Sequence, residues 1–231
     1  MFDVPYTKIA SGFSIDPDTN PITAGLRDSI LVNTTDDVVI YDHLVAAKVQ
    51  VSAPERETLI DGRLTDEAKL VEAMAGVDVV YLNKMLQLNE VRTVIAAMKA
   101  THVNRLIATT VVGIYGETGG DFGVWNIKQL GAPAIGRLRR CADAVERSGL
   151  DYTILRYTWL YEESDNDKFV MVPQNQKFML AQLSREGLIK GIMEVLTDTS
   201  GTYIKANYGI GEPGTIQEKP FFYMDDEDTE E

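Results

Sequence analysis

The stretch RLIATTVVGIYGE, residues 105–117, decides the fold class of this chain. Its first half is short and apolar, and segments with helical periodicity flank the stretch on both sides. Such a run is typical of a central strand in a parallel sheet. Its second half contains Thr109, Thr110, Gly113 and Tyr115. Ligands bind outside the carboxyl ends of parallel strands in open sheets, so we expect any active site to lie near Thr110 and Tyr115.

Apolar strands alternate with amphipathic helices along the rest of the chain. Apolar side chains recur at helical spacing in residues 22–30, 70–74, 88–98, 138–145 and 188–196. Strands are predicted at residues 9–16, 38–41, 57–60, 77–82, 105–110, 151–160 and 202–205, and 169–172 is expected to pair with 177–180. The alternation predicts an α/β fold, a doubly wound parallel sheet with helices on both faces.

The chain has 231 residues, which fits one α/β domain. We expect this domain to span residues 1–224, with a small C-terminal substrate lobe at about 158–183 and an acidic, solvated tail at 225–231. Residues 119–131 are predicted to be a loop anchored by Trp125. The N-terminal sequence lacks a signal-peptide pattern, and no apolar run approaches the ~20 residues of a spanning helix. We therefore expect a cytoplasmic protein.

Charge and cysteine content narrow the possible partners. The net charge of −13 argues against nucleic acid and against an anionic membrane surface, because both are bound through clustered Lys and Arg. Cys141 is the only cysteine in the sequence, and His43 and His102 lie far apart. No Cys or His spacing suggests a metal site. The expected partner is a small molecule whose identity the sequence does not give.

Four segments resemble the atypical short-chain dehydrogenase/reductases, in their small NAD(P)H-binding, NmrA-like group. The segments are DGRLTDEAKLVEAMAGVDVVY, RLIATTVVGIYGE with FGVWN, VERSGLDYTILRYTWL and LSREGLIKGIMEVLTD, and the likeness extends from about residue 36 to 213. This resemblance implies a Rossmann-like sheet, NAD or NADP across its carboxyl edge, and often an oxidoreductase activity. It also makes a homodimer through outer helices possible.

The glycine-rich phosphate loop of that family is degenerate in this chain. When the first helices are aligned, the loop falls at residues 16–23, DPDTNPIT, where Pro17, Asn20 and Thr23 occupy the positions of small residues. Prolines lack the N–H groups that bind phosphate. The two aspartates of the loop oppose a pyrophosphate, because two unit charges ~4 Å apart repel by roughly 4 kcal/mol at an effective dielectric near 20. Alternatively, the true loop is residues 10–12, Ala-Ser-Gly.

The second departure from the family is catalytic. Many relatives pair a tyrosine with a lysine four residues later, which lowers the tyrosine pKa. No such pair occurs here, and the nearest, Tyr152 with Arg156, lies on a predicted strand where this spacing does not bring side chains together. On the helix where this group often places a tyrosine, Leu138 falls on the apolar stripe, and its simplest role is core packing.

The resemblance also implies which residues would contact a dinucleotide. Asp42 follows the second strand, suits the ribose diol and would favour NAD over NADP, although it alternatively caps a turn. Arg63 replaces an acidic residue beside the adenine, and it either binds the cofactor or is an ordinary surface arginine. The predicted cofactor contacts are Thr19, Asn20, Asp42, Arg63, Leu64, Leu82, Asn83, Lys84, Thr109 and Thr158.

Two residues are predicted to be catalytic. Thr110 stands where relatives carry a catalytic-type serine, and Tyr115 is either a substitute acid or an aromatic side chain packed on the sheet edge.

The first hypothesis is an NAD(P)-dependent oxidoreductase that transfers hydride between the nicotinamide and a small carbonyl or quinone-like substrate. The alternative is a non-catalytic NmrA-like sensor or scaffold that has lost normal dinucleotide binding. A third, a pocket for a less anionic small molecule, also stays open.

Overall fold

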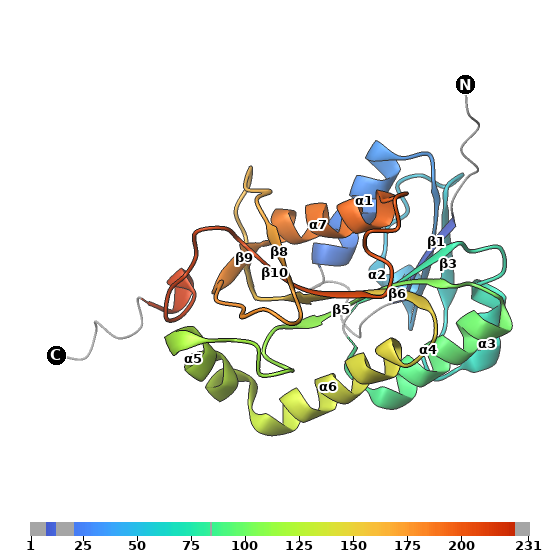
Figure 1. The fold of residues 1–231 in the computed structure, drawn as a ribbon. Helices are drawn as coiled ribbons and strands as arrows, with labels where there is room; N and C mark the ends of the chain where they lie inside the picture. Colours follow the sequence, from blue (N-terminus) through green and yellow to red (C-terminus); the bar gives the residue numbers. More distant parts are fainter. Residues whose placement is uncertain (1–7, 13–20, 84, 225–231) are drawn as a thin grey trace.

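A computed structural model describes residues 8–12, 21–83 and 85–224, and Figure 1 shows how they are arranged. Within these residues one sheet has the strand order β3-β2-β1-β4-β5-β6-β10-β8, and all neighbours are parallel except β10 and β8. Its strands are β1 (Lys8–Gly12), β2 (Asp37–Asp42), β3 (Glu57–Asp61), β4 (Val79–Leu82), β5 (Arg105–Val111), β6 (Asp151–Tyr157), β8 (Val170–Pro173) and β10 (Ala206–Gly211). The short strands β7 (Trp159–Tyr161) and β9 (Gln182–Ser184) form a separate parallel pair.

Helices cover both faces of the sheet, so the predicted doubly wound α/β fold is confirmed (Figure 1). Side chains of α1 and α7 contribute to the core on one face, and those of α3, α4 and α6 to the core on the other. The helices are α1 (Pro21–Asn33), α2 (Val45–Lys48), α3 (Glu67–Ala73), α4 (Leu88–Ala100), α5 (Gly120–Leu130), α6 (Ala132–Glu146), α7 (Arg185–Thr197) and the 3-10 helix η1 (Phe221–Tyr223).

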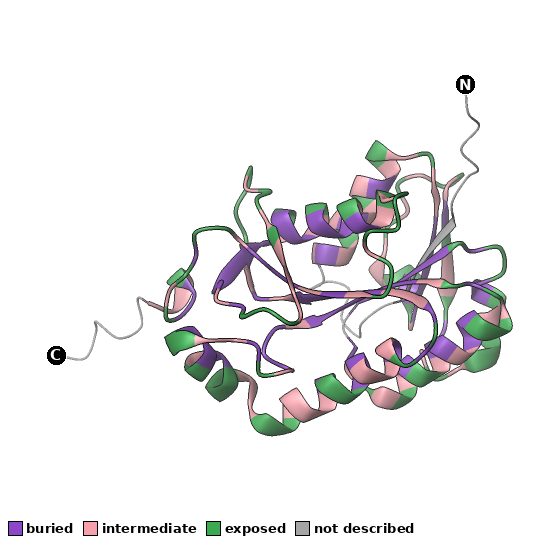
Figure 2. Cartoon of the chain, viewed as in Figure 1, coloured by how far each residue is buried: buried purple, intermediate pink, exposed green. Residues whose placement is uncertain are grey.

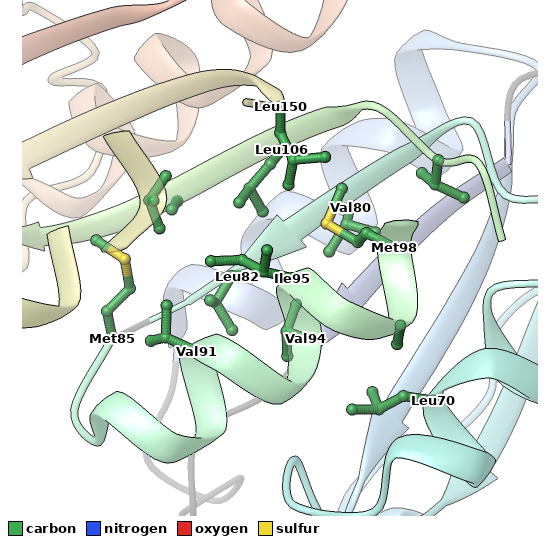
Figure 3. Close-up of a cluster of buried hydrophobic side chains, with 14 of the residues drawn as sticks. Leu70, Val80, Leu82, Met85, Val91, Val94, Ile95, Met98, Leu106 and Leu150 are labelled. Atoms are coloured by element: carbon green, nitrogen blue, oxygen red, sulfur yellow. The ribbon is translucent and has the colours of Figure 1, made fainter. Parts of the chain in front are cut away.

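The central strand β5 separates two cores because successive side chains of a strand point to opposite faces. Leu106 belongs to the core under α4 and α6, whereas Ile107 belongs to the core under α1 and α7. Figure 3 shows the first core, in which Val91, Ile95 and Met98 of α4 lie against the sheet. In Figure 2 the strands are largely buried and the outward faces of the helices are exposed. This packing gives the carboxyl edge of the sheet a rigid support.

Several local predictions were wrong. Residues 119–131 were predicted to be a loop, but they contain α5, whose glycines hide its helical pattern. Residues 169–172 and 177–180 do not pair with each other: β8 pairs with β10, while Phe178 bridges to Thr118. The last strand lies at Ala206–Gly211 instead of 202–205. Residues 10–12 pair with β2 and β4 as part of β1, so the alternative phosphate loop there is also wrong.

Candidate functional site

The candidate site lies at the carboxyl ends of the strands around the switch point between β1 and β4. Gly12, the last residue of β1, pairs with Tyr41 on one side and Leu82 on the other. The predicted contacts Thr19, Asn20 and Lys84 lie outside the described residues. Helix α1 begins at Pro21, whose nitrogen carries no hydrogen to donate. The predicted shortage of backbone donors therefore extends into the first turn of α1.

A polar network joins the first turn of α1 to the ends of β4 and β5. The Asn83 side-chain amide donates to Thr23 Oγ1 at 3.2 Å, and its carbonyl accepts from Thr109 Oγ1 at 3.1 Å. The Tyr81 hydroxyl also donates to Asn83 Oδ1, at 3.4 Å. The predicted contacts Asn83 and Thr109 thus lie together, and Asn83 positions α1 against the sheet.

Asp42 ends β2 and is held by two donors. Its Oδ1 accepts from the His43 backbone N–H at 2.7 Å, and its Oδ2 lies 3.2 Å from Lys48 Nζ. Burial raises the pKa of Asp42, while hydrogen bonds from Lys48 and His43 oppose that rise. The sequence analysis did not identify Lys48, since a lysine six residues after the aspartate shows no motif. Asp42 therefore carries a partly neutralised carboxylate at the predicted ribose position.

A polar cavity of about 530 Å³ opens beside the ends of β2 and β3. Arg63, Lys69 and His43 line it together with acidic residues, and Arg63 Nη2 lies 3.2 Å from His43 Nε2. Gly62 lets the chain pass under Tyr41, because a Cβ at position 62 would lie 2.2 Å from the Tyr41 hydroxyl. That hydroxyl donates to the Arg63 carbonyl at 2.9 Å. The cavity therefore lies where the sequence predicts the adenosine end of a dinucleotide, and charged side chains make up much of its lining.

The predicted catalytic residues lie on the face of the sheet that α6 covers. Thr110 pairs with Arg156 of β6, and the Tyr115 ring lies 5.7 Å from the Arg156 guanidinium carbon. Among the described residues the Thr110 hydroxyl is buried without a hydrogen-bond partner, and the Asn207 side chain faces the Tyr115 hydroxyl. Burial, and then Glu146 and Asp143 on α6, raise the pKa of Tyr115. The Tyr115 phenol therefore keeps its proton.

A buried ion pair fixes the loop between β5 and α5. The guanidinium of Arg156 contacts the Glu117 carboxylate, and both side chains are almost fully buried. Glu117 accepts from the backbone N–H groups of Gly113 at 2.9 Å and Tyr115 at 3.0 Å. Gly113 has φ +92°. The sequence analysis did not identify this pair. The available signal was a single arginine inside the apolar strand 153–157, since a buried charge requires a buried partner.

An apolar pocket of about 220 Å³ lies where β5, α5 and β6 meet. The side chains and backbone that line it are Val111, Val112, Asn126, Leu130, Tyr157, Thr158, Trp159 and Leu160. The predicted contact Thr158 is among them, and its hydroxyl donates to the carbonyls of Leu180 and Ala181 at 2.9 Å. Thr110 and Tyr115 are not among them. The pocket suits a small apolar group.

Aromatic side chains pack around Trp159, which lines this pocket. Trp159 meets Trp125 of α5 at 4.8 Å between ring centroids, and Tyr223 of η1 packs on both at 5.2 and 5.5 Å. The small lobe at 158–183 stays a prediction; strand β7 lies within this range, and β9, which pairs with β7, begins inside it. Of the other predicted contacts, Leu64 and Leu82 pack into the core under α4.

The residues present fit a dinucleotide along this edge. A carboxylate ends β2, a close glycine turn follows β3, and an amide and a hydroxyl end β4 and β5. Pro21 is the departure, because it removes a donor from the start of α1. Within the described residues, no group of three or more His, Cys, Asp or Glu is placed to hold a metal ion. None of the described helices is long and apolar enough to cross a membrane.

Comparisons with known proteins agree with this geometry. Residues 31–199 match the sequence model of a family described as NAD(P)H-binding. A short-chain dehydrogenase/reductase from Veillonella parvula DSM 2008, solved in complex with NADP, is similar with a TM-score of 0.88 and 26% identity, over 94% of this chain and 100% of that chain. A Rossmann-fold NAD(P)-binding family protein from Shigella flexneri has a TM-score of 0.75 and 29% identity with the same coverage.

More distant likeness concerns the fold alone. An anaerobillin reductase, ChuY from Escherichia coli O157:H7, has a TM-score of 0.68 at 17% identity, over 90% of this chain and 98% of its own. No curated protein matches the sequence significantly.

Proposed function

The chain belongs to the NAD(P)H-binding family, and we propose that it is an NAD(P)-binding oxidoreductase of the atypical short-chain dehydrogenase type. The observation that carries the proposal is the order of three features along one sheet edge. A charged cavity lies beside β2 and β3, a polar network ends β4 and β5, and an apolar pocket ends β6. This order follows the adenosine, ribose and nicotinamide of an extended dinucleotide.

The proposed substrate is a small carbonyl or quinone-like compound. The apolar pocket of about 220 Å³ supports this substrate class, because its lining offers no charged side chain to an ionic substrate. A bound nicotinamide supplies the hydride chemistry, while the protein orients the reacting groups. We assign the orienting of the substrate oxygen to Thr110 of β5 and to Tyr115 in the loop after β5.

We propose NAD as the preferred cofactor because Asp42 stands at the ribose position. Its ion pair with Lys48 reduces the negative charge that a 2′-phosphate would meet. We therefore expect a small preference, with NADH bound more tightly than NADPH by a modest factor.

Calorimetric titration with NADH and NADPH tests the proposal. We expect saturable binding of NADH to the wild-type protein, weakened about tenfold or more in Asp42→Ala because a charge-assisted hydrogen bond is lost. Asp28→Ala is the matched control, since it removes an exposed carboxylate from the outer surface of α1. A folded protein that binds neither nucleotide would overturn the proposal.

A non-catalytic sensor or scaffold is the second candidate, and two residues favour it. Pro21 removes a phosphate donor, and Leu138 of α6 is buried where relatives often carry a tyrosine. This candidate predicts no oxidation of NADH or NADPH in the presence of ketones or quinones. Robust turnover, followed by the loss of nicotinamide absorbance, would exclude it.

A further inference from the structure

A further cavity, of about 390 Å³, lies between α4 and α6, and we call it the α4–α6 groove. The two helices run side by side over the same face of the sheet (Figure 1). Leu88 and Ile95 of α4 and Ala144 of α6 form the apolar part of its lining. The groove shares no lining residue with the polar cavity beside β2 and β3 or with the apolar pocket. Its volume suits a small molecule, since ligand sites measure about 300–1,000 Å³.

The rest of the lining of the groove is charged. It consists of Arg92 of α4 and of Arg140, Asp143 and Arg147 of α6. Asp143 Oδ2 lies 3.8 Å from Arg147 Nη2, so this carboxylate partly neutralises one guanidinium group. Arg92 and Arg140 form no hydrogen bond or ion pair with another described residue. Two guanidinium groups, one on each helix, are therefore available to a ligand.

The charge of this groove is opposite to that of the chain as a whole. The net charge of the chain is −13, which disfavours small anions over most of its surface. In the groove, three arginines accompany a single aspartate. Arginine binds phosphate through the parallel N–H groups of its planar guanidinium, and the aliphatic part of its side chain covers apolar surface. The groove therefore offers a ligand both positive charge and apolar contact.

We propose that the α4–α6 groove binds a small phosphate ester. Arg92 and Arg140 bind its phosphate group from the two helices, and its apolar part lies against the apolar side chains of the groove. A phosphate monoester suits two guanidinium groups better than a carboxylate does, because it carries nearly two negative charges and three acceptor oxygens at neutral pH. The proposal is independent of the proposed function, since no residue of the sheet edge and no cofactor takes part in it.

Titrations with phenyl phosphate and with inorganic phosphate, followed by ³¹P NMR near neutral pH at constant ionic strength, test the groove. Both probes carry the phosphate group, but only phenyl phosphate has an apolar part. We expect saturable binding of phenyl phosphate in the low millimolar range, which is usual for a ligand of this size. Inorganic phosphate should bind about threefold or more weakly, because it buries no apolar surface.

Substitutions in the lining locate the site. Arg92→Gln and Arg140→Gln should each weaken phenyl phosphate about two- to fivefold, a modest effect because exposed ion pairs contribute little. Asp143→Asn should tighten it about twofold, since the carboxylate that opposes the phosphate is removed, and a gain of affinity does not result from misfolding. Arg139→Gln is the matched control, because it removes an exposed arginine of α6 that does not line the groove. We expect it to leave the Kd of both probes unchanged.

Each other outcome overturns the proposal. No saturable binding of phenyl phosphate to the wild-type protein would show that the groove holds no phosphate ester. Unchanged affinity in either of the two arginine variants of the groove would place the phosphate elsewhere, and equal weakening in Arg139→Gln would show only a general effect of charge. Equal affinity for inorganic phosphate would show that the apolar lining recognises nothing. NADH titration of the same variants is separate, so failure of cofactor binding is distinguishable from failure of the groove.

Discussion

Glu57, at the first position of β3, is a buried carboxylate that organises the preceding turn. Its Oε2 accepts from the backbone N–H groups of Ser52 at 2.7 Å and Ala53 at 2.6 Å, and Arg27 lies 3.6 Å from Oε1. Burial alone would raise the pKa of Glu57, but these donors together lower it. The ionised form is therefore favoured in the folded protein.

We expect Glu57→Gln to lower the free energy of unfolding by ~2 kcal/mol near pH 7, because charge-assisted hydrogen bonds are lost. A carboxylate with a lowered folded pKa stabilises the protein above its unfolded pKa, and this contribution disappears as the pH falls through the folded value. The difference between wild type and variant should therefore shrink below about pH 4.5. Urea denaturation at several pH values measures it.

The exposed Glu55, in the same turn, provides the control. Glu55→Gln should change stability little at any pH, since a surface charge contributes little. If Glu57→Gln lowered the free energy of unfolding equally in acid and at neutral pH, the stabilisation would not come from the ionised carboxylate.

At the scale of single residues, the positions of polar side chains at strand ends were predictable from the sequence, but their hydrogen-bond and ion-pair partners were not. Asp42 and Asn83 were placed at strand ends because the apolar runs stop there. The partner of Asp42 is Lys48, and the partner of Arg156 is Glu117, 39 residues away. Such pairs form only once the loops have folded, and loop sequences have no periodic pattern from which these contacts could be predicted. The assignments of Thr110 and Tyr115 to catalysis stay predictions.

Helix α5 is the element whose sequence gave the weakest signal. Gly123 is buried within it, and a Cβ there would lie 2.7 Å from the Thr118 carbonyl oxygen. Glycine lowers helix propensity by about 1 kcal/mol relative to alanine, so the pattern of this segment predicts a loop. Packing of α5 against the loop after β5 outweighs this propensity.

Gly123 of α5 and Gly136 of α6 give opposite predictions. We expect Gly123→Ala to destabilise the protein by about 1–3 kcal/mol, because the added methyl group meets main-chain atoms that cannot rotate away. Gly136→Ala on α6 should stabilise it by up to about 1 kcal/mol, since the nearest atom is the end of the Arg140 side chain at 3.7 Å. Urea denaturation compares them. Stabilisation by both substitutions would contradict the packing of α5.

The longer helices were predictable because their apolar faces are regular. Leu88, Val91, Ile95 and Met98 were expected on one face of a helix, and α4 runs over Leu88–Ala100. Helix α7 begins after the N-cap Ser184, whose hydroxyl accepts from the Gly187 backbone N–H at 3.0 Å. The edge strand β8 was assigned the wrong partner, because four residues of mixed burial fit several pairings.

At the scale of the whole molecule, the C-terminal segment packs against β9 and the two tryptophans. Gln182 of β9 accepts from Gln217 Nε2 at 2.7 Å and from the Phe221 backbone N–H at 3.1 Å. These bonds place Tyr223 on Trp125 and Trp159. A segment more than 60 residues after Trp159 thus completes the aromatic cluster around Trp159.

We expect Tyr223→Ala to lower the free energy of unfolding by about 2 kcal/mol, through lost apolar burial and lost aromatic contacts. Phe221→Ala should cost less, because Phe221 is 47% exposed. Thermal unfolding measures both variants. A larger loss in Phe221→Ala would show that Tyr223 does not anchor the segment.

The chain contains two tryptophans: Trp159 lines the apolar pocket, and the Trp125 ring packs against Trp159. Its intrinsic fluorescence therefore comes almost entirely from this one place, without background from distant indoles. Occupation of the pocket should quench or shift that emission, and reduced nicotinamide bound nearby should accept its excitation energy. The protein carries its own optical reporter of site occupancy, which makes an unlabelled search for ligands practical.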